Sequence, residues 1–151
     1  MDFIRKATND DVSRIAEIFV FNNRMNYFPI FKDEDYSFKT LQVMTVCKSY
    51  LSSKQLENTY VYDDGIIRGF IEIQDSEIKR LYVDPFFQNK GIGAELISYA
   101  VNTQNAKFLW ALEKNTKALK FYQSHGFLKT DMRMLEEGTA EYLIQLKKIT
   151  K

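Results

Sequence analysis

The sequence predicts one mixed α/β domain over residues 1–151, with about seven strands and about four helices. The order of apolar patterns predicts this class: period-two and helical-period segments follow one another as β-α-α-β-β-β-loop-α-β-α-β-β, without a repeat or a linker. Composition agrees, because 45% hydrophobic and 27% charged residues are typical of a chain that folds around a core. A doubly wound sheet is not expected, since turns separate most of the strands.

Charge and composition exclude several classes of protein. The net charge is +1 with interleaved signs, so no strong attraction to nucleic acid or membrane is expected. No apolar run has the length of a membrane span and the N-terminus has no apolar signal core, so we expect a cytoplasmic protein. We expect it to be a monomer or a homodimer. With one cysteine and one histidine, we expect no intramolecular disulfide and no metal site.

The N-terminal half begins with a short predicted strand over residues 2–8. An acidic first turn after Thr8 or Asn9 predicts a helix start. The segment 22–37 is aromatic and broken by Pro29, so no regular element is expected there. A second helix is predicted from apolar residues at helical spacing: Phe38, Leu41, Met44, Cys47 and Leu51.

The C-terminal half alternates strands with two helices. Asp64-Gly65 predicts a hairpin between two β-rich segments of residues 55–75, and a further strand spans 77–83. A helix follows the glycine loop, with a buried face through either Ile92, Leu96 and Ala100 or Ile97 and Val101. A strand is predicted over residues 107–113. The segment 115–127 is predicted to contain a short helix that ends just before Gly126, and the tail is predicted to form a hairpin that turns at Glu137-Gly138.

The loop between the strand at 77–83 and the next helix reads QNKGIG, residues 88–93. A dinucleotide fingerprint needs a small residue where Leu96 stands, and a nucleotide P-loop needs its lysine after the glycines rather than at Lys90. Two interpretations remain. Backbone N–H groups at the helix start can bind an anion, or the glycines serve only a tight turn.

Two motifs together resemble those of the GCN5-related N-acetyltransferase (GNAT) superfamily. LYVDPFFQNKGIGAELI, residues 81–97, resembles the family's motif A, and NTKALKFYQSHGF, residues 115–127, resembles its next motif. The resemblance implies the GNAT fold, a mixed and mostly antiparallel sheet flanked by helices, with two splayed parallel strands at its centre.

The resemblance also implies a binding site for acetyl-coenzyme A. Its pyrophosphate would lie on loop amides, and its pantetheine arm between the strands 78–83 and 107–112. The implied cofactor-binding residues are Leu81, Tyr82, Val83, Gln88, Asn89, Lys90, Gly91, Ile92, Gly93, Ala94, Asn115 and Tyr122.

The chemistry implied is direct attack of an amine on the thioester. The Leu81 amide matches the position that polarises the carbonyl, and Tyr122 the tyrosine that protonates the thiolate. Tyr122 as a side chain that caps the core is the alternative. For the base that deprotonates the amine, Glu77, Glu72 and ordered water remain alternatives, while His125 reads as a helix-end cap.

Acceptor recognition is the least determined part. Tyr27, Phe28 and Phe31 either line an acceptor pocket or pack the first helices onto the sheet. Together with Glu72, Asp75 and Glu77 they favour an amine-bearing acceptor. The predicted function is therefore acetyl transfer to a primary amine of a small molecule or a peptide. The alternative is an inactive coenzyme A-binding sensor or interaction module.

Overall fold

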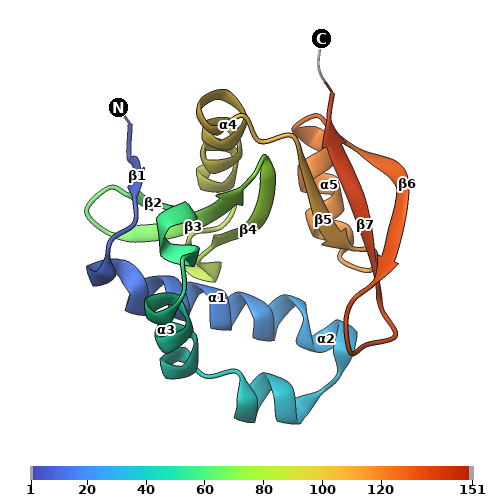
Figure 1. Ribbon diagram of the computed structural model, residues 1–151, viewed down its shortest axis with the longest axis horizontal. Helices are drawn as coiled ribbons and strands as arrows, with labels where there is room; N and C mark the ends of the chain where they lie inside the picture. Colours follow the sequence, from blue (N-terminus) through green and yellow to red (C-terminus); the bar gives the residue numbers. More distant parts are fainter. Residues whose placement is uncertain (1, 150–151) are drawn as a thin grey trace.

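The computed structural model describes residues 2–149 and contains one seven-stranded sheet with the strand order β1-β2-β3-β4-β5-β7-β6 (Figure 1). All neighbouring strands are antiparallel except β4 and β5, which are parallel. The predicted fold class is thus confirmed. The strands are β1 (Ile4–Lys6), β2 (Thr59–Asp63), β3 (Ile67–Gln74), β4 (Glu77–Val83), β5 (Phe108–Leu112), β6 (Phe127–Leu135) and β7 (Tyr142–Lys148).

Helices cover both faces of this sheet. They are α1 (Val12–Asn26), α2 (Phe28–Phe31), α3 (Val43–Ser52), α4 (Ile92–Gln104) and α5 (Thr116–Ser124), with one turn of π-helix at Tyr36–Thr40. Side chains of α1 and α3 form one buried cluster with Val61 and Phe70, and α4 forms a second one with β3, β4 and β5 on the opposite face. No helix between residues 2 and 149 is long and apolar enough to cross a membrane.

The strands and the last two helices lie where the sequence predicts them. The hairpin at Asp64-Gly65 and the strand at 77–83 are confirmed. In α4 the buried residues come from both predicted faces: Ile92, Leu96, Ile97 and Ala100. At the start of α1, the Thr8 backbone N–H donates to Asp11 Oδ2 at 2.8 Å, which confirms a helix start at this acidic turn.

Two predictions in the N-terminal half are wrong. The irregular segment expected over 22–37 is partly helical, because α1 continues to Asn26. The second helix begins at Val43 rather than Phe38, since Leu41 and Gln42 are extended and interrupt the helical phase. Val46 and Tyr50 are therefore buried, whereas Met44 and Leu51 are 71% and 57% exposed.

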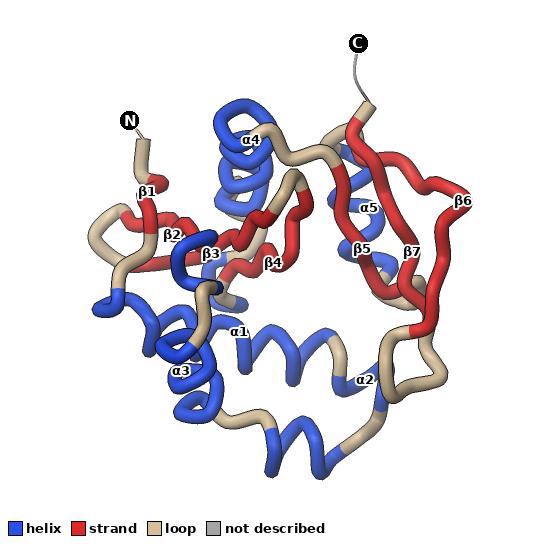
Figure 2. Tube along the Cα trace, viewed as in Figure 1, coloured by secondary structure: helices blue, strands red, loops and turns tan. Residues whose placement is uncertain are grey.

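The centre of the sheet splits between β4 and β5 (Figure 2). These strands pair only at Glu77 with Phe108 and Ile78 with Leu109. Directly after this point β4 carries an extra residue, Lys79, relative to β3, and such a bulge bends a strand away from its neighbour. The predicted splayed parallel strands are confirmed, and the opening between them leads into the candidate site.

Candidate active site

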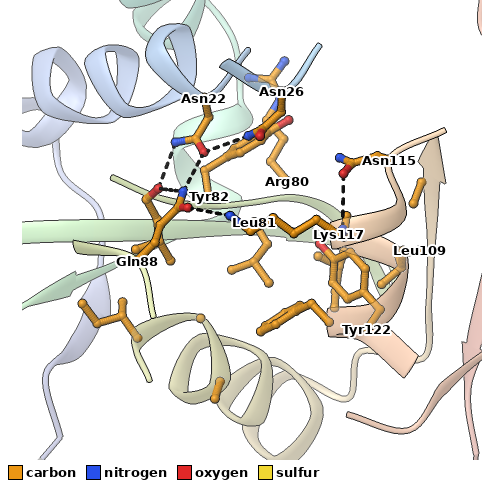
Figure 3. A pocket seen from close by; sticks show the side chains of 18 of the residues that line it. Asn22, Asn26, Arg80, Leu81, Tyr82, Gln88, Leu109, Asn115, Lys117 and Tyr122 are labelled. Atoms are coloured by element: carbon orange, nitrogen blue, oxygen red, sulfur yellow. Dashed lines mark hydrogen bonds between the residues drawn. The ribbon is translucent and has the colours of Figure 1, made fainter. Parts of the chain in front are cut away.

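The split leads into a cavity of about 330 Å³ (Figure 3). Its walls come from β4, β5, the glycine loop, the start of α4, and α5. Asn22, Asn26 and Tyr27 add a further wall from the C-terminal end of α1. Two sequence-distant motifs, residues 81–97 and 115–127, therefore face one common space.

Backbone groups of β4 point into this split. The Asp84 N–H donates to the Arg68 carbonyl of β3 at 2.9 Å. Because backbone groups alternate in direction along a strand, the N–H and C=O groups of Leu81 and Val83 point the other way, toward β5. The Leu81 amide is thus placed to donate a hydrogen bond into the cavity, as its predicted role requires.

The glycine loop owes its two glycines to different constraints. Gly91 has φ +83° at the N-terminal cap of α4, a conformation that side chains disfavour, and a Cβ there would meet no atom within 4 Å. Gly93 lies in the first turn of α4, and a Cβ there would lie 3.2 Å from Phe121 Cζ. Backbone shape thus requires the first glycine, and close approach of α5 requires the second.

Gln88 connects three walls of the cavity (Figure 3). Its Nε2 donates to the Val83 carbonyl at 3.1 Å and to Asn22 Oδ1 at 3.3 Å, while its Oε1 accepts from Lys117 Nζ at 3.0 Å. The Asn22 Nδ2 also donates to the Val83 carbonyl, at 3.0 Å. Neither Asn22 nor Lys117 was predicted as a site residue. Asn22 lies outside both motifs, Lys117 stands in the second motif at a position without a predicted role, and both meet Gln88 only in the folded chain.

Asn115 and Tyr122 both line the cavity from α5. The Asn115 side chain also caps this helix, since its Oδ1 accepts from the Ala118 N–H at 3.2 Å. The Tyr122 hydroxyl makes no hydrogen bond with residues 2–149 and projects toward the space in front of Leu81 (Figure 3). Burial of the ring raises the pKa of Tyr122, so the phenol keeps its proton at neutral pH.

The two candidate bases lie outside the cavity lining that residues 2–149 provide. Glu72 is 4% exposed and accepts a hydrogen bond from the Tyr50 hydroxyl at 3.3 Å. Its burial raises the pKa of this carboxyl. Glu77 instead pairs with Lys79 Nζ at 3.1 Å, where β4 and β5 are still joined.

Of the three predicted acceptor-binding residues, Tyr27, Phe28 and Phe31, only Tyr27 lines the cavity. The hydroxyl oxygens of Tyr27 and Tyr82 lie 2.9 Å apart and share a hydrogen bond. Phe28 packs on Phe38 with ring centroids 5.1 Å apart, and Phe31 packs on Tyr27 at 6.4 Å. These two rings pack within the helical segment of residues 27–38 rather than on the sheet, so an acceptor-binding role for Phe28 and Phe31 stays a prediction.

The remaining candidate side chains have simpler roles. The exposed Lys90 ammonium lies 5.9 Å from the Phe87 ring centroid, at the rim of the loop. His125 Nδ1 lies 2.8 Å from the Phe121 carbonyl at the C-terminal end of α5, which confirms the cap. Among residues 2–149, no group of three or more His, Cys, Asp or Glu side chains could hold a metal ion.

Comparison with known proteins agrees with this geometry. The domain family described as "Acetyltransferase (GNAT) domain" matches residues 55–129, which contain both motifs of the cavity. The chain belongs to the GNAT superfamily.

This GNAT chain is similar to several individual proteins over much of its length. It is 30% identical to the peptidyl-lysine N-acetyltransferase YiaC of Escherichia coli over 90 residues, 59% of this chain and 60% of that relative. Two solved structures share its fold. The apo form of YjaB from Escherichia coli has a TM-score of 0.77 and 18% identity, over 98% of this chain and 97% of its own. PaiA N-acetyltransferase from Thermoplasma acidophilum in complex with coenzyme A has a TM-score of 0.68 and 20% identity, over 95% and 97%.

Proposed function

We propose that this GNAT protein transfers the acetyl group of acetyl-coenzyme A to a primary amine of a small molecule or a peptide. One observation carries the proposal: the glycine loop, the free backbone groups of β4 and the Tyr122 hydroxyl all face a single cavity at the split of the sheet. An anion site, an extended hydrogen-bonding edge and a proton donor are the three parts that transfer from this thioester needs.

The residues present fit coenzyme A. Backbone N–H groups at the start of α4 and the positive end of its helix dipole suit a pyrophosphate. Lys117 extends from α5 to Gln88 and adds a positive charge at this mouth of the cavity. The Val83 carbonyl already accepts two side-chain hydrogen bonds, so the N–H groups of Val83 and Leu81 would bind the pantetheine arm.

Catalysis then follows from two donors placed on different walls. The Leu81 N–H donates to the thioester oxygen and stabilises the charge that develops there as the amine nitrogen bonds to the acetyl carbon. When the C–S bond breaks, the Tyr122 hydroxyl protonates the departing thiolate. The Tyr122 phenol carries its proton at neutral pH, as a general acid must, and burial, which raises its pKa, keeps the proton in place until the thiolate forms.

The amine must lose a proton, and we assign this step to ordered water. Glu72 is engaged by Tyr50 and Arg80, and Glu77 by Lys79. Neither carboxylate lines the cavity, so each would reach an amine bound there through intervening water.

The test is acetyl-coenzyme A turnover with a panel of amines. Free thiol is measured against an amine-free blank, and acetylated product is identified by mass spectrometry. The panel contains amino acids, polyamines and lysine peptides, the last because the YiaC relative is named a peptidyl-lysine N-acetyltransferase. We expect amine-dependent thiol release at least ~10-fold above the blank.

The alternative, a coenzyme A-binding module without catalysis, predicts a different result. Such a protein would be stabilised by acetyl-coenzyme A in a thermal melt but would release no thiol with any amine. A protein that neither binds acetyl-coenzyme A nor turns it over would contradict both functions.

A further inference from the structure

A second cavity, of about 250 Å³, lies on the α1 and α3 face of the sheet. Aromatic and aliphatic side chains form much of its wall, among them Phe19, Tyr36, Val46 and Tyr50. Its cationic group is Arg80 of β4, which also lines the cavity at the split. Arg80 therefore marks the place where an apolar pocket adjoins the proposed reaction site.

The Arg80 guanidinium uses one of its nitrogens as a hydrogen-bond donor within residues 2–149. Its Nη1 donates to the Tyr50 hydroxyl at 3.0 Å, and its Nε lies 3.9 Å from Glu72 Oε1, beyond hydrogen-bond distance. It makes no second hydrogen bond with residues 2–149. The Phe19 ring lies under it at 4.2 Å, so the planar cation is held in place by stacking as well. Because a guanidinium carries further N–H groups, Arg80 can still bind a carboxylate through two parallel hydrogen bonds.

The charge around both cavities differs from what the sequence suggested. Among the described residues, no Asp or Glu side chain lines either cavity, while Lys79, Arg80 and Lys117 do. Glu72, Asp75 and Glu77, which were expected to favour an amine-bearing acceptor, line neither cavity. Glu72 accepts from Tyr50, and Glu77 pairs with Lys79. A multiply charged polyamine would therefore meet positive charge and no carboxylate at this site.

We propose that the acceptor is a small amine that carries a carboxylate, bound by Arg80, and an apolar or aromatic side chain, bound in the second cavity. This inference rests on the proposed acetyl transfer and adds the acceptor class to it. Arg80 lines both cavities, so a carboxylate bound to it would hold a neighbouring amino group where the second cavity borders the space at the split. The size agrees, since a 250 Å³ space is below the range of drug-sized pockets and suits a single side chain.

An alternative role for Arg80 is to neutralise the buried Glu72, which has 5% of its side chain exposed. Removal of Arg80 alone would leave that carboxylate uncompensated and could unfold the protein. The experiment therefore compares Arg80→Met/Glu72→Gln with Glu72→Gln alone, because a neutral amide at position 72 needs no cation. Arg80→Lys keeps the charge but loses the planar fork.

The readout is the ratio of kcat/KM for L-phenylalanine to that for L-phenylalaninamide, which differ at the carboxylate. Comparing this ratio between variants cancels the difference in amine basicity and any general loss of activity. We expect the ratio to fall about 10- to 100-fold from Glu72→Gln to the double variant, as for the loss of a charge-assisted pair. The ratio for Arg80→Lys should lie between those of the wild type and the double variant.

Arg133→Met is the matched control. Arg133 lies on the edge strand β6, pairs with Glu113 and lines neither cavity, so its removal should leave the ratio unchanged. Thermal melts with and without acetyl-coenzyme A establish that every variant folds and binds the donor.

The results separate this inference from the proposed function. Equal ratios in all variants, or turnover of amines that lack a carboxylate but not of amino acids, would overturn the inference and leave acetyl transfer standing. If no panel amine reacts, binding decides. L-phenylalanine, but not its amide, should raise the melting temperature of the coenzyme A-saturated protein, and the absence of that shift would overturn the inference. Failure to bind acetyl-coenzyme A would overturn the proposed function itself.

Discussion

Tyr122 packs in the core through its ring and lines the cavity, where a chemical role is predicted for its hydroxyl. Its ring packs against Phe121 and Phe127, with centroids 5.3 and 6.2 Å away, while its hydroxyl remains free in the cavity. A core side chain would satisfy this hydroxyl within the protein. The aromatic neighbours hold the ring, and the hydroxyl is left available to a ligand in the cavity, as the predicted proton-donor role requires.

Replacing Tyr122 by Phe should separate these roles. The ring and its packing remain, so the melting temperature and the affinity for acetyl-coenzyme A should change little. The turnover number should fall ~10²-fold, the lower end for loss of a general acid. Single-turnover kinetics with a saturating amine measure the loss. Unchanged turnover together with a lower melting temperature would make Tyr122 a packing residue.

The pH dependence gives a second readout of the same side chain. Burial raises the pKa of Tyr122 above the ordinary tyrosine value of about 10, so its proton is present below that pH and is lost only above it. Turnover of the wild type should therefore rise with pH as the acceptor amine becomes neutral, without a decline due to Tyr122 before about pH 10. A decline near neutrality that Tyr122→Phe removes would contradict the raised pKa, because the phenol would then lose its proton at that pH.

At the scale of elements, the turn from β4 into α4 is set by two glycines with unequal tasks. Gly91 supplies a positive φ in open space, and Gly93 admits the Phe121 ring of α5. The first constraint is local and readable from the sequence. The second depends on α5, which follows more than twenty residues later in the chain.

Alanine at each glycine should therefore act differently. Gly91→Ala forces a side chain into the left-handed region, which costs on the order of 1–2 kcal/mol and lowers the melting temperature by roughly 2–8 °C. Gly93→Ala should change stability less and raise KM for acetyl-coenzyme A, because Phe121 must shift within the cavity wall. Melting curves and initial rates provide both measurements.

Gly138 offers a matched control for Gly91. It has φ +76° in the β6–β7 turn, again with no atom within 4 Å of an added Cβ, and it lies outside the cavity lining. Gly138→Ala should lose similar stability and keep its KM for acetyl-coenzyme A. If both variants raise KM equally, the glycine loop has no special part in binding the donor.

At the scale of the whole molecule, the split sheet makes two halves that a ligand can join. One half carries β1–β4 and the other β5, β7 and β6 with α5, and the sheet connects them through two residue pairs. A donor bound in the split would contact β4 on one side and α5 on the other. Binding should thus stiffen the junction itself.

Acetyl-coenzyme A should therefore slow amide hydrogen exchange in β4, β5 and α5 more than in β1 and β2, which lie outside the cavity. At about 100 times its Kd, the ligand stabilises the native state by ~2.7 kcal/mol, or roughly 5–10 °C in melting temperature. Hydrogen exchange followed by mass spectrometry tests where the ligand protects the chain. Thermal melts measure the size of the stabilisation. Protection confined to β1 and β2 would place the ligand elsewhere.

Local sequence patterns were sufficient to predict the short-range parts of the fold. Hairpin turns at Asp64-Gly65 and Glu137-Gly138, the start of α1 and the cap at Asn115 depend on residues a few positions apart, so spacing and residue type suffice to predict them. The two motifs of the cavity are equally short, which is why the family and the fold class were readable. The roles predicted for the cofactor-binding residues stay predictions.

Contacts between side chains far apart in the chain could not be predicted in this way. Tyr50 reaches Glu72 across 22 residues of chain, Lys117 reaches Gln88 across 29, and Gln88 reaches Asn22 across 66. No local pattern encodes such contacts, because the sheet order and the direction of each helix face set them. The same holds for α3, whose buried face depends on the break at Leu41 and Gln42. The position of Arg80 between two cavities, and with it the proposed acceptor class, arises at this level because strand pairing and helix packing together build the space around it.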